Sequence, residues 1–258
     1  MLNIAAGRYF RDRKFRFSSR NEVVAILSAA GIGLVSPLPT YAAIPVGLSL
    51  LETGLPVSAV IAFAIASPLM NPSIFLLTAA RIGLEMALAR TVSAFLFALI
   101  GGFLAMTLLK RLFADVRPMK PPEPKPHPAL GREIYSNAKY MLKYFSIAIL
   151  LSAAVKALVP PETVISLLAG NAKVGTLVAI GMGVPFYTCG GSAIPFIETL
   201  MDLGMSKGAT LAFFLAGPAT KLETLYAYKT LLGTKILMFF LSLTFIFSYL
   251  AGLVYSLF

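Results

Sequence analysis

Uncharged apolar stretches that approach or exceed the length needed to cross a lipid bilayer dominate this sequence. They run through Val92–Leu109, Ile236–Phe258 and Phe145–Val155 with its flanking residues. A helix needs about 20 such residues to span the hydrocarbon core. A soluble domain of this size would not bury a chain that is 58% hydrophobic in one core. The sequence therefore predicts an all-α integral membrane protein with about 6–8 membrane segments.

An internal repeat organises these segments. Shifted by 150 residues, Gly31–Pro68 aligns without a gap on Gly181–Pro218, and 12 of the 38 positions are identical. Several of the matches are glycines and prolines: Gly31/Gly181, Gly33/Gly183, Gly54/Gly204, Pro45/Pro195 and Pro68/Pro218. Apolar composition alone would not place glycine and proline in register, so the chain contains two related halves.

Each repeat is expected to contain two broken apolar segments followed by one unbroken helix. In the first repeat the broken segments are Val23–Thr53 and Pro56–Ile82; in the second they are Val174–Leu203 and Ser206–Leu232. The residues assigned to the breaks are Pro37, Pro39, Pro68, Pro72, Pro185, Gly190, Gly191 and Pro218. Interrupted helices are tolerated in a membrane where protein or a water-filled cavity covers the freed backbone groups. Paired breaks therefore predict an interior polar site, although kinks also serve packing alone.

Basic residues outside the apolar stretches set the expected orientation. Residues 1–20 interleave Arg with Phe and Tyr, and residues 110–143 combine Lys and Arg with a proline-rich run at 118–128. By the positive-inside rule both are cytoplasmic, so the first repeat crosses the membrane an even number of times. A re-entrant hairpin in one broken segment satisfies this count. The additional helix Lys139–Val159 then inverts the second repeat, a recurring transporter plan.

The chain is accordingly divided into five parts. These are a basic amphipathic cytoplasmic N-terminus (1–21), a first membrane repeat (22–109), a cytoplasmic proline-rich basic loop (110–138), an additional transmembrane helix (139–170) and a second membrane repeat (171–258).

Charge and rare residues exclude several function classes. The 22 Lys and Arg against 11 Asp and Glu suit contact with anionic lipid, so no nucleic acid partner is expected. One Cys and one His exclude an internal disulfide and a histidine metal cluster. No phosphate-binding glycine loop, Ser/His/Asp set or zinc-spaced ligand set occurs. We therefore expect no enzyme activity and no cofactor.

The motifs at the breaks resemble those of a known family. Residues 181–195 (GMGVPFYTCGGSAIP) and 212–220 (AFFLAGPAT) look like the second-half signature of the predicted permeases that include organoarsenical efflux permeases, the ArsP-like group. Residues 62–72 (AFAIASPLMNP) resemble its first-half signature. The resemblance implies a plasma-membrane permease and, for some members, efflux of trivalent arsenicals or soft metals. Where members often carry Cys-x-Cys, this chain has Cys189 and Gly191, so one chain cannot form a multi-thiolate cage.

The second half holds most of the candidate solute-pathway residues. Cys189 precedes a half-helix, where a thiolate is favoured and can bind a soft metal, although Cys is also a common small buried residue. Lys221 and Glu223 lie in an apolar context, where ionisable groups are costly and usually mark a solute pathway or an ion pair. Alternatively, they lie near the membrane interface and extend their charged ends into water. Glu198 can carry a proton in a cavity. Thr220 is the last candidate solute-pathway residue in the second half.

In the first half, Asn71 is the repeat counterpart of Lys221 and can line the same cavity from the other side. Asp202 and its counterpart Glu52 adjoin glycines and suit a loop or interface. Arg81, Glu85 and Arg90 are expected to be interfacial anchors.

Three functions compete at this stage. The first is a permease for a small solute, with the repeats rocking about the breaks. The second is a membrane thiol or redox protein, which needs a partner to supply a second thiol because the chain has only Cys189. The third is a non-transporting membrane subunit that docks a partner through the proline-rich loop. Membrane lipid is a contact in all three, and a homo-oligomer or partner subunit is open.

Overall fold

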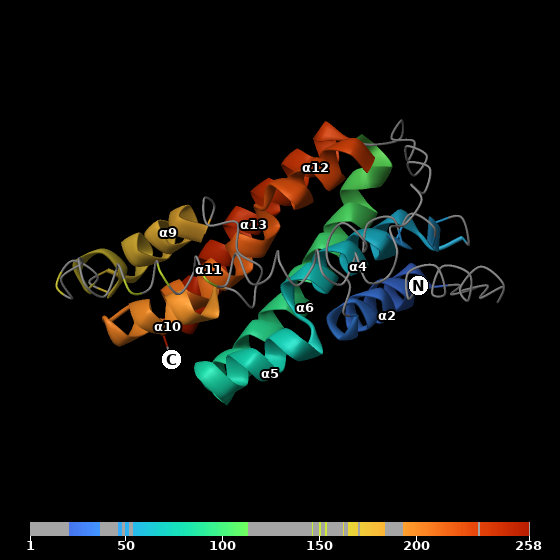
Figure 1. Cartoon of the computed structure of the whole chain (residues 1–258). Coiled ribbons are helices and arrows are strands. Elements are labelled where there is room, and N and C mark those ends of the chain that lie inside the picture. Colours follow the sequence, from blue (N-terminus) through green and yellow to red (C-terminus); the bar gives the residue numbers. More distant parts are fainter. Residues whose placement is uncertain are drawn as a thin grey trace.

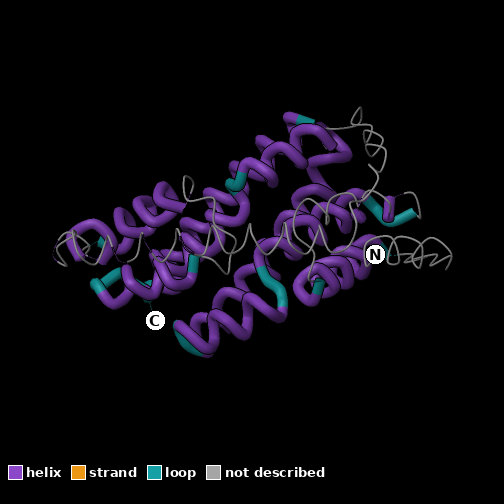
Figure 2. Tube along the Cα trace, viewed as in Figure 1, coloured by secondary structure: helices purple, strands orange, loops and turns teal. Residues whose placement is uncertain are grey.

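The computed structural model describes residues 21–36, 46–47, 50–51, 54–112, 165–169, 171–183, 193–231 and 233–257, with four single positions between 146 and 162. All regular structure in these residues is helical, and no strand occurs among them (Figure 2). The expectation of an all-α protein is confirmed for this part of the chain. The N-terminal segment, the proline-rich loop and almost all of the expected helix Lys139–Val159 lie outside the described residues.

The first half contains α2 (Glu22–Val35), α4 (Val57–Leu69), α5 (Pro72–Arg81) and α6 (Leu84–Leu112). α5 begins where Asn71 accepts a hydrogen bond from the backbone N–H of Ile74 at 2.9 Å and Pro72 takes the first helical position. Both residue types are preferred at these positions of a helix start. α6 is continuous and ends at Leu112, beyond the expected end at Leu109.

The second half contains α9 (Ala172–Gly183), α10 (Ile194–Asp202), α11 (Lys207–Ala219), α12 (Leu222–Leu231) and α13 (Thr234–Tyr255), and a π-helical turn, η1 (Ile165–Ala169), precedes α9. The bounds of α4 and α11, and of α5 and α12, differ by 150 residues at both ends. Turn glycines with positive φ also recur at this offset, as Gly54/Gly204 and Gly83/Gly233. The helix starts and the turns of the two halves therefore recur at the same 150-residue offset that was found in the sequence.

Three helices cross at an equivalent glycine in each half. A Cβ added to Gly102 of α6 would lie 2.7 Å from Cγ2 of Ile26 in α2 and 3.1 Å from Cβ of Ala62 in α4. In the other half, a Cβ on Gly252 of α13 would lie 3.0 Å from Cβ of Ala212 in α11. Small residues at such crossings let the backbones of membrane helices approach closely.

α2 and α4 lie side by side and run in the same direction. Near their starts the hydroxyl of Ser58 donates to Oε1 of Glu22 at 2.7 Å. Near their ends Gly33 lies against the backbone nitrogen of Ser67. Both helices therefore begin at the same end of the molecule, and the chain returns to that end between them.

α6 and α13, the third helices of the two halves, pack in opposite directions (Figure 1). At the start of α6, Glu85 accepts a hydrogen bond at 3.0 Å from Tyr255, the last residue of α13. Farther along α6, a Cβ on Gly101 would lie 3.4 Å from Leu243, three turns back along α13. The two halves thus meet along an antiparallel helix pair.

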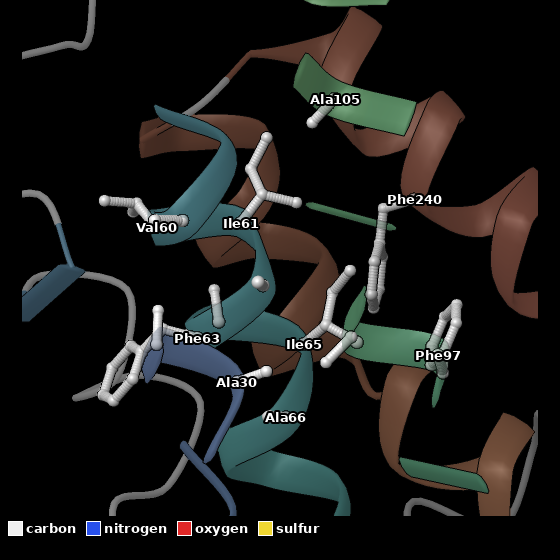
Figure 3. Packing of buried hydrophobic residues seen from close by; sticks show 14 of the residues in the cluster. Ala30, Val60, Ile61, Phe63, Ile65, Ala66, Phe97, Ala105 and Phe240 are labelled. Carbon is white, nitrogen blue, oxygen red and sulfur yellow. The ribbon is translucent and has the colours of Figure 1, made fainter. Parts of the chain in front are cut away.

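The core is built around α4 and α11. Every residue of α4 from Ser58 to Ser67 is buried, as is every residue of α11 from Gly208 to Ala219. A helix that is apolar and covered on all sides is a central element. Figure 3 shows Ile65 of α4 on the side that faces Phe97 of α6 and Phe240 of α13. α4 and α11 are therefore interior helices, which leaves α6 and α13 to present apolar residues outward.

Three helical segments of the described chain are long and apolar enough to cross a membrane: Val57–Arg81, Leu84–Leu108 and Thr234–Tyr255. The first is α4 and α5 end to end, because Met70 and Asn71 are extended and interrupt it. α2 and α9 are shorter apolar helices, with lengths of about 20 Å at 1.5 Å per residue. The molecule is thus a helical membrane protein.

Candidate functional site

The interruption between α4 and α5 is local and comes from two prolines. Pro68 lies in the last turn of α4 and Pro72 in the first turn of α5, so neither can donate a helical N–H bond. The helix runs through Pro68 and breaks at Met70 and Asn71, two residues later than the proline itself. Asn71 is half-buried and its side-chain oxygen caps α5. The N-terminus of α5 therefore begins at Asn71, with Pro72 and Ser73 exposed.

The equivalent interruption separates α11 from α12 at Thr220 and Lys221. Pro218 again lies in the last turn of the preceding helix. The buried hydroxyl of Thr220 donates to the backbone oxygens of Ala216 and Gly217 at 3.1 and 3.3 Å. The hydroxyl of Thr224 donates to the carbonyl of Pro218 at 3.2 Å. Side-chain hydroxyls thus satisfy carbonyl groups in the last turn of α11.

In each half the end of the first helix lies beside this interruption. Gly33 of α2 lies near the backbone of Phe63 and Ser67, and Gly183 of α9 lies near the backbone of Phe213 and Gly217. The contacted positions again differ by 150. In each half the C-terminal ends of two helices, α2 with α4 and α9 with α11, therefore lie together. This is the arrangement expected of a site built from discontinuous helices.

The segments that follow α2 and α9 carry other predicted residues. Pro37, Pro39, Pro185, Gly190, Gly191 and the candidate ligand Cys189 all lie outside the described residues. Among the described residues no group of three or more His, Cys, Asp or Glu side chains is placed to hold a metal ion.

The remaining candidates are distributed around the interruptions. Lys221 is half-buried, and its carbonyl accepts the N–H of Leu225 at 2.9 Å, as Asn71 does from Phe75 in the first half. Glu223 lies on α12, and its side chain is outside the described part. The structure thus places Asn71 and Lys221 at equivalent interruptions of different halves.

Glu198 is tied to the other half. On α10 it faces Arg81 at the end of α5, with Oε2 of Glu198 and Nε of Arg81 4.0 Å apart. Close to the start of α6, Lys207 donates to both carboxylate oxygens of Glu85 at 2.9 and 2.8 Å. Asp202, by contrast, is exposed at the end of α10. Acid–base pairs therefore join the two halves at one end of the molecule.

Arg90 is not an interfacial anchor, contrary to the sequence expectation. Its side chain is 0% exposed. Nη1 donates to the hydroxyl of Thr78 in α5 at 3.3 Å, and Nη2 donates to the carbonyl of Leu69 at the end of α4 at 3.4 Å. Its guanidinium carbon lies 4.3 Å from the ring centroid of Phe214 in α11. Sequence reasoning missed this residue because it lies near the start of an apolar stretch, where a cation usually marks the interface.

Duplicated, interrupted apolar helices whose two halves meet along the antiparallel pair α6 and α13 define a polytopic membrane protein. The chain belongs to the predicted permease family, whose model matches residues 13–257. The resemblance seen in the break motifs is thereby confirmed. The family is described as one of predicted permeases, which indicates a transporter.

Two relatives illustrate how far the similarity extends. The UPF0718 protein MJ0584 of Methanocaldococcus jannaschii is 30% identical over 127 residues, which cover 48% of this chain and 35% of that protein. The UPF0718 protein YcgR of Bacillus subtilis is 25% identical over 223 residues, which cover 81% of this chain and 74% of that protein. The aligned region thus spans about a third of the archaeal relative. No solved structure matches the chain.

Proposed function

We propose that the protein is a plasma-membrane permease whose two inverted halves move a small solute past the interruptions at Asn71 and Lys221. The antiparallel packing of α6 against α13 carries this proposal. These helices are repeat counterparts, so halves joined in this way have opposite orientations in the membrane. Inverted repeats with discontinuous helices commonly hold solute and ions at their interface.

The directions of the helices support the topology expected from charge. α2 and α4 begin at the same end, so α2 and the returning chain form a re-entrant hairpin, and α4 with α5 crosses before α6 crosses back. The N-terminus and the loop 110–138 then share the cytoplasmic side. Since α9 begins at the end where α6 begins rather than ends, the helix Lys139–Val159 supplies the crossing between the halves.

The chemistry at the interruptions suits a polar or thiophilic solute. The N-terminus of α5 carries partial positive charge, and Lys221 adds a full cation at the equivalent place. Thr220, next to Lys221, and Glu223 are further proposed pathway residues. Glu198 faces Arg81 across the two halves, so this charge pair would change as the halves move. During transport one half would rock against the other about the contact between α6 and α13.

For the substrate we propose a soft, thiol-reactive species bound by Cys189. Thiolates prefer soft metals and metalloids. A trivalent arsenical that already carries organic groups has fewer positions open to thiolates than arsenite, so it fits a chain with one cysteine better. Efflux of an organoarsenical is therefore the favoured form of this activity.

The test is solute flux in proteoliposomes with an imposed proton gradient, comparing a trivalent organoarsenical, arsenite and a soft metal ion. We expect the organoarsenical to move fastest. Cys189→Ser and Lys221→Ala should each slow it about tenfold, the effect of losing one contact of about 1.4 kcal/mol. Lys229→Ala, an exposed cation on α12, is the matched control and should leave the rate unchanged.

Two negative outcomes have different meanings. If purified protein moved none of these solutes faster than empty liposomes, the proposed transport activity would be wrong. If wild-type protein transported but the Cys189 and Lys221 variants matched it, only the assigned site would be wrong.

A further inference from the structure

The same structural position holds a buried cation in one half and an aromatic stack in the other. Arg90 of α6 contacts Thr78 of α5. Their counterparts 150 residues later are Phe240 of α13 and Tyr228 of α12, whose rings stack with centroids 4.2 Å apart. The second half therefore forms the equivalent contact between two helices with two uncharged rings.

Keeping an arginine at this place is costly. An ionised group buried in a membrane helix costs several kcal/mol unless it is well paired. Because the Tyr228–Phe240 stack shows that the fold accommodates an uncharged pair at the equivalent place, packing alone does not require a cation at position 90.

The partners of Arg90 indicate what the charge does. Leu69 is the last residue of α4, so its carbonyl has lost the helical N–H donor that an unbroken helix would supply. Nη2 of Arg90 donates to that oxygen, and a cation also suits the negative end of a helix dipole. Nη1 also donates a hydrogen bond to the hydroxyl of Thr78 in α5. One side chain thus contacts both helices that flank the interruption.

Arg90 also reaches across to the other half. Its guanidinium lies over the ring of Phe214 in α11, an attractive cation–π geometry. Phe214 lies one turn before Pro218, close to the second interruption. The geometry points to Arg90 as a positioning residue that sets the angle between α4 and α5 and links that angle to α11 of the opposite half.

Distances between pairs of spin labels test this role without any solute, so the outcome does not depend on the proposed transport activity. In a Cys189→Ser background, labels at Leu27 and Leu76 report how α5 is oriented relative to α2 and α4. Their counterparts Leu177 and Tyr226 provide a matched internal control. All of these side chains are exposed, at 42%, 67%, 57% and 70%.

Arg90→Met should broaden the 27–76 distance distribution roughly twofold, because a helix break without its cap loses a fixed angle. The 177–226 distribution should stay as in the unmodified background. Phe214→Leu should give a smaller broadening of the same pair. If Arg90→Met does not yield folded protein, Arg90→Lys replaces it; lysine keeps the charge but loses the two-point geometry, so broadening is again expected.

Unchanged 27–76 distances in the Arg90 variant would overturn the inference. Equal broadening of both label pairs would also overturn it, since that result means general loosening of the protein rather than positioning of one interruption.

Discussion

The rings of Phe97 and Phe247 stack with centroids 4.9 Å apart and 15° between their planes, and the two residues are repeat counterparts. A two-fold operation brings a residue against its own counterpart only where the axis passes. In the proposed inverted arrangement, an approximate two-fold axis runs between these rings. Because α6 and α13 are antiparallel, the axis is perpendicular to them.

This stack should behave as one energetic unit. Phe97→Leu and Phe247→Leu should each lower the free energy of unfolding by about 1 kcal/mol or more. The double substitution should cost less than the sum by about 0.5–1.5 kcal/mol, the usual worth of an aromatic pair. Reversible unfolding in bicelles measures these values. Phe245→Leu, on an exposed face two residues away, should instead be additive with Phe97→Leu.

The helix crossings at Gly102 and Gly252 should not tolerate a methyl group. Gly252→Ala should destabilise the protein by about 1–3 kcal/mol, because the new Cβ would lie 2.8 Å from the carbonyl oxygen of Gly208. Gly102→Ala should cost less, since its nearest neighbour is the side chain of Ile26. Thermal unfolding in detergent is the measurement. Gly31→Ala is the control, because nothing lies within 4 Å of its Cβ position; a loss there equal to that at Gly252 would contradict the crossing argument.

The pair formed by Glu85 and Lys207 should affect transport more than stability. Both side chains are exposed, and such pairs add little to stability. Since the pair joins the halves at one end, Glu85→Lys should slow flux by placing two cations together when that end closes. Adding Lys207→Glu to Glu85→Lys should recover most of the rate in the proteoliposome assay. No recovery in this charge-swapped protein would mean that the pair plays no part in closing that end.

The proposed orientation makes a simple labelling prediction. In a Cys189→Ser background, Ser18→Cys and Ala129→Cys should resist a membrane-impermeant maleimide in intact cells and react once the cells are permeabilised. Leu257→Cys, beyond the end of α13, should react in intact cells. Reaction of positions 18 and 129 from opposite sides would show that the first half crosses an odd number of times.

Much of the fold was predictable because glycine and proline have local effects that sequence spacing preserves. The offset of 150 residues anticipated the matching bounds of α4 and α11, and the break between α4 and α5 falls within the expected stretch. The helices nevertheless run through Pro68 and Pro218, since a proline removes a hydrogen bond to the residue four earlier and leaves the next residues free to stay helical. The interruptions are therefore narrower than the sequence suggested.

The candidate site was less predictable, because its contacts join residues far apart in the chain. The partners of Arg90 come from α4, α5 and α11, and none of them is visible from the pattern around position 90. The pairing of Glu198 with Arg81 likewise depends on how the halves meet. A clue to Arg90 was present: its counterpart is Phe240, and replacement of an aromatic core position by a cation is unusual in a repeat.

The placement of α6 and α9 sets a length requirement on the stretch that joins the halves. α6 ends at the face opposite to the one where α9 starts, so the joining stretch must contain enough chain to traverse about 30 Å of hydrocarbon, roughly 20 helical residues. Shortening the proline-rich run at 118–128 leaves that reach intact. Removing the apolar residues at 145–155 would not, and in the proposed topology the second half could then no longer take the orientation opposite to that of the first.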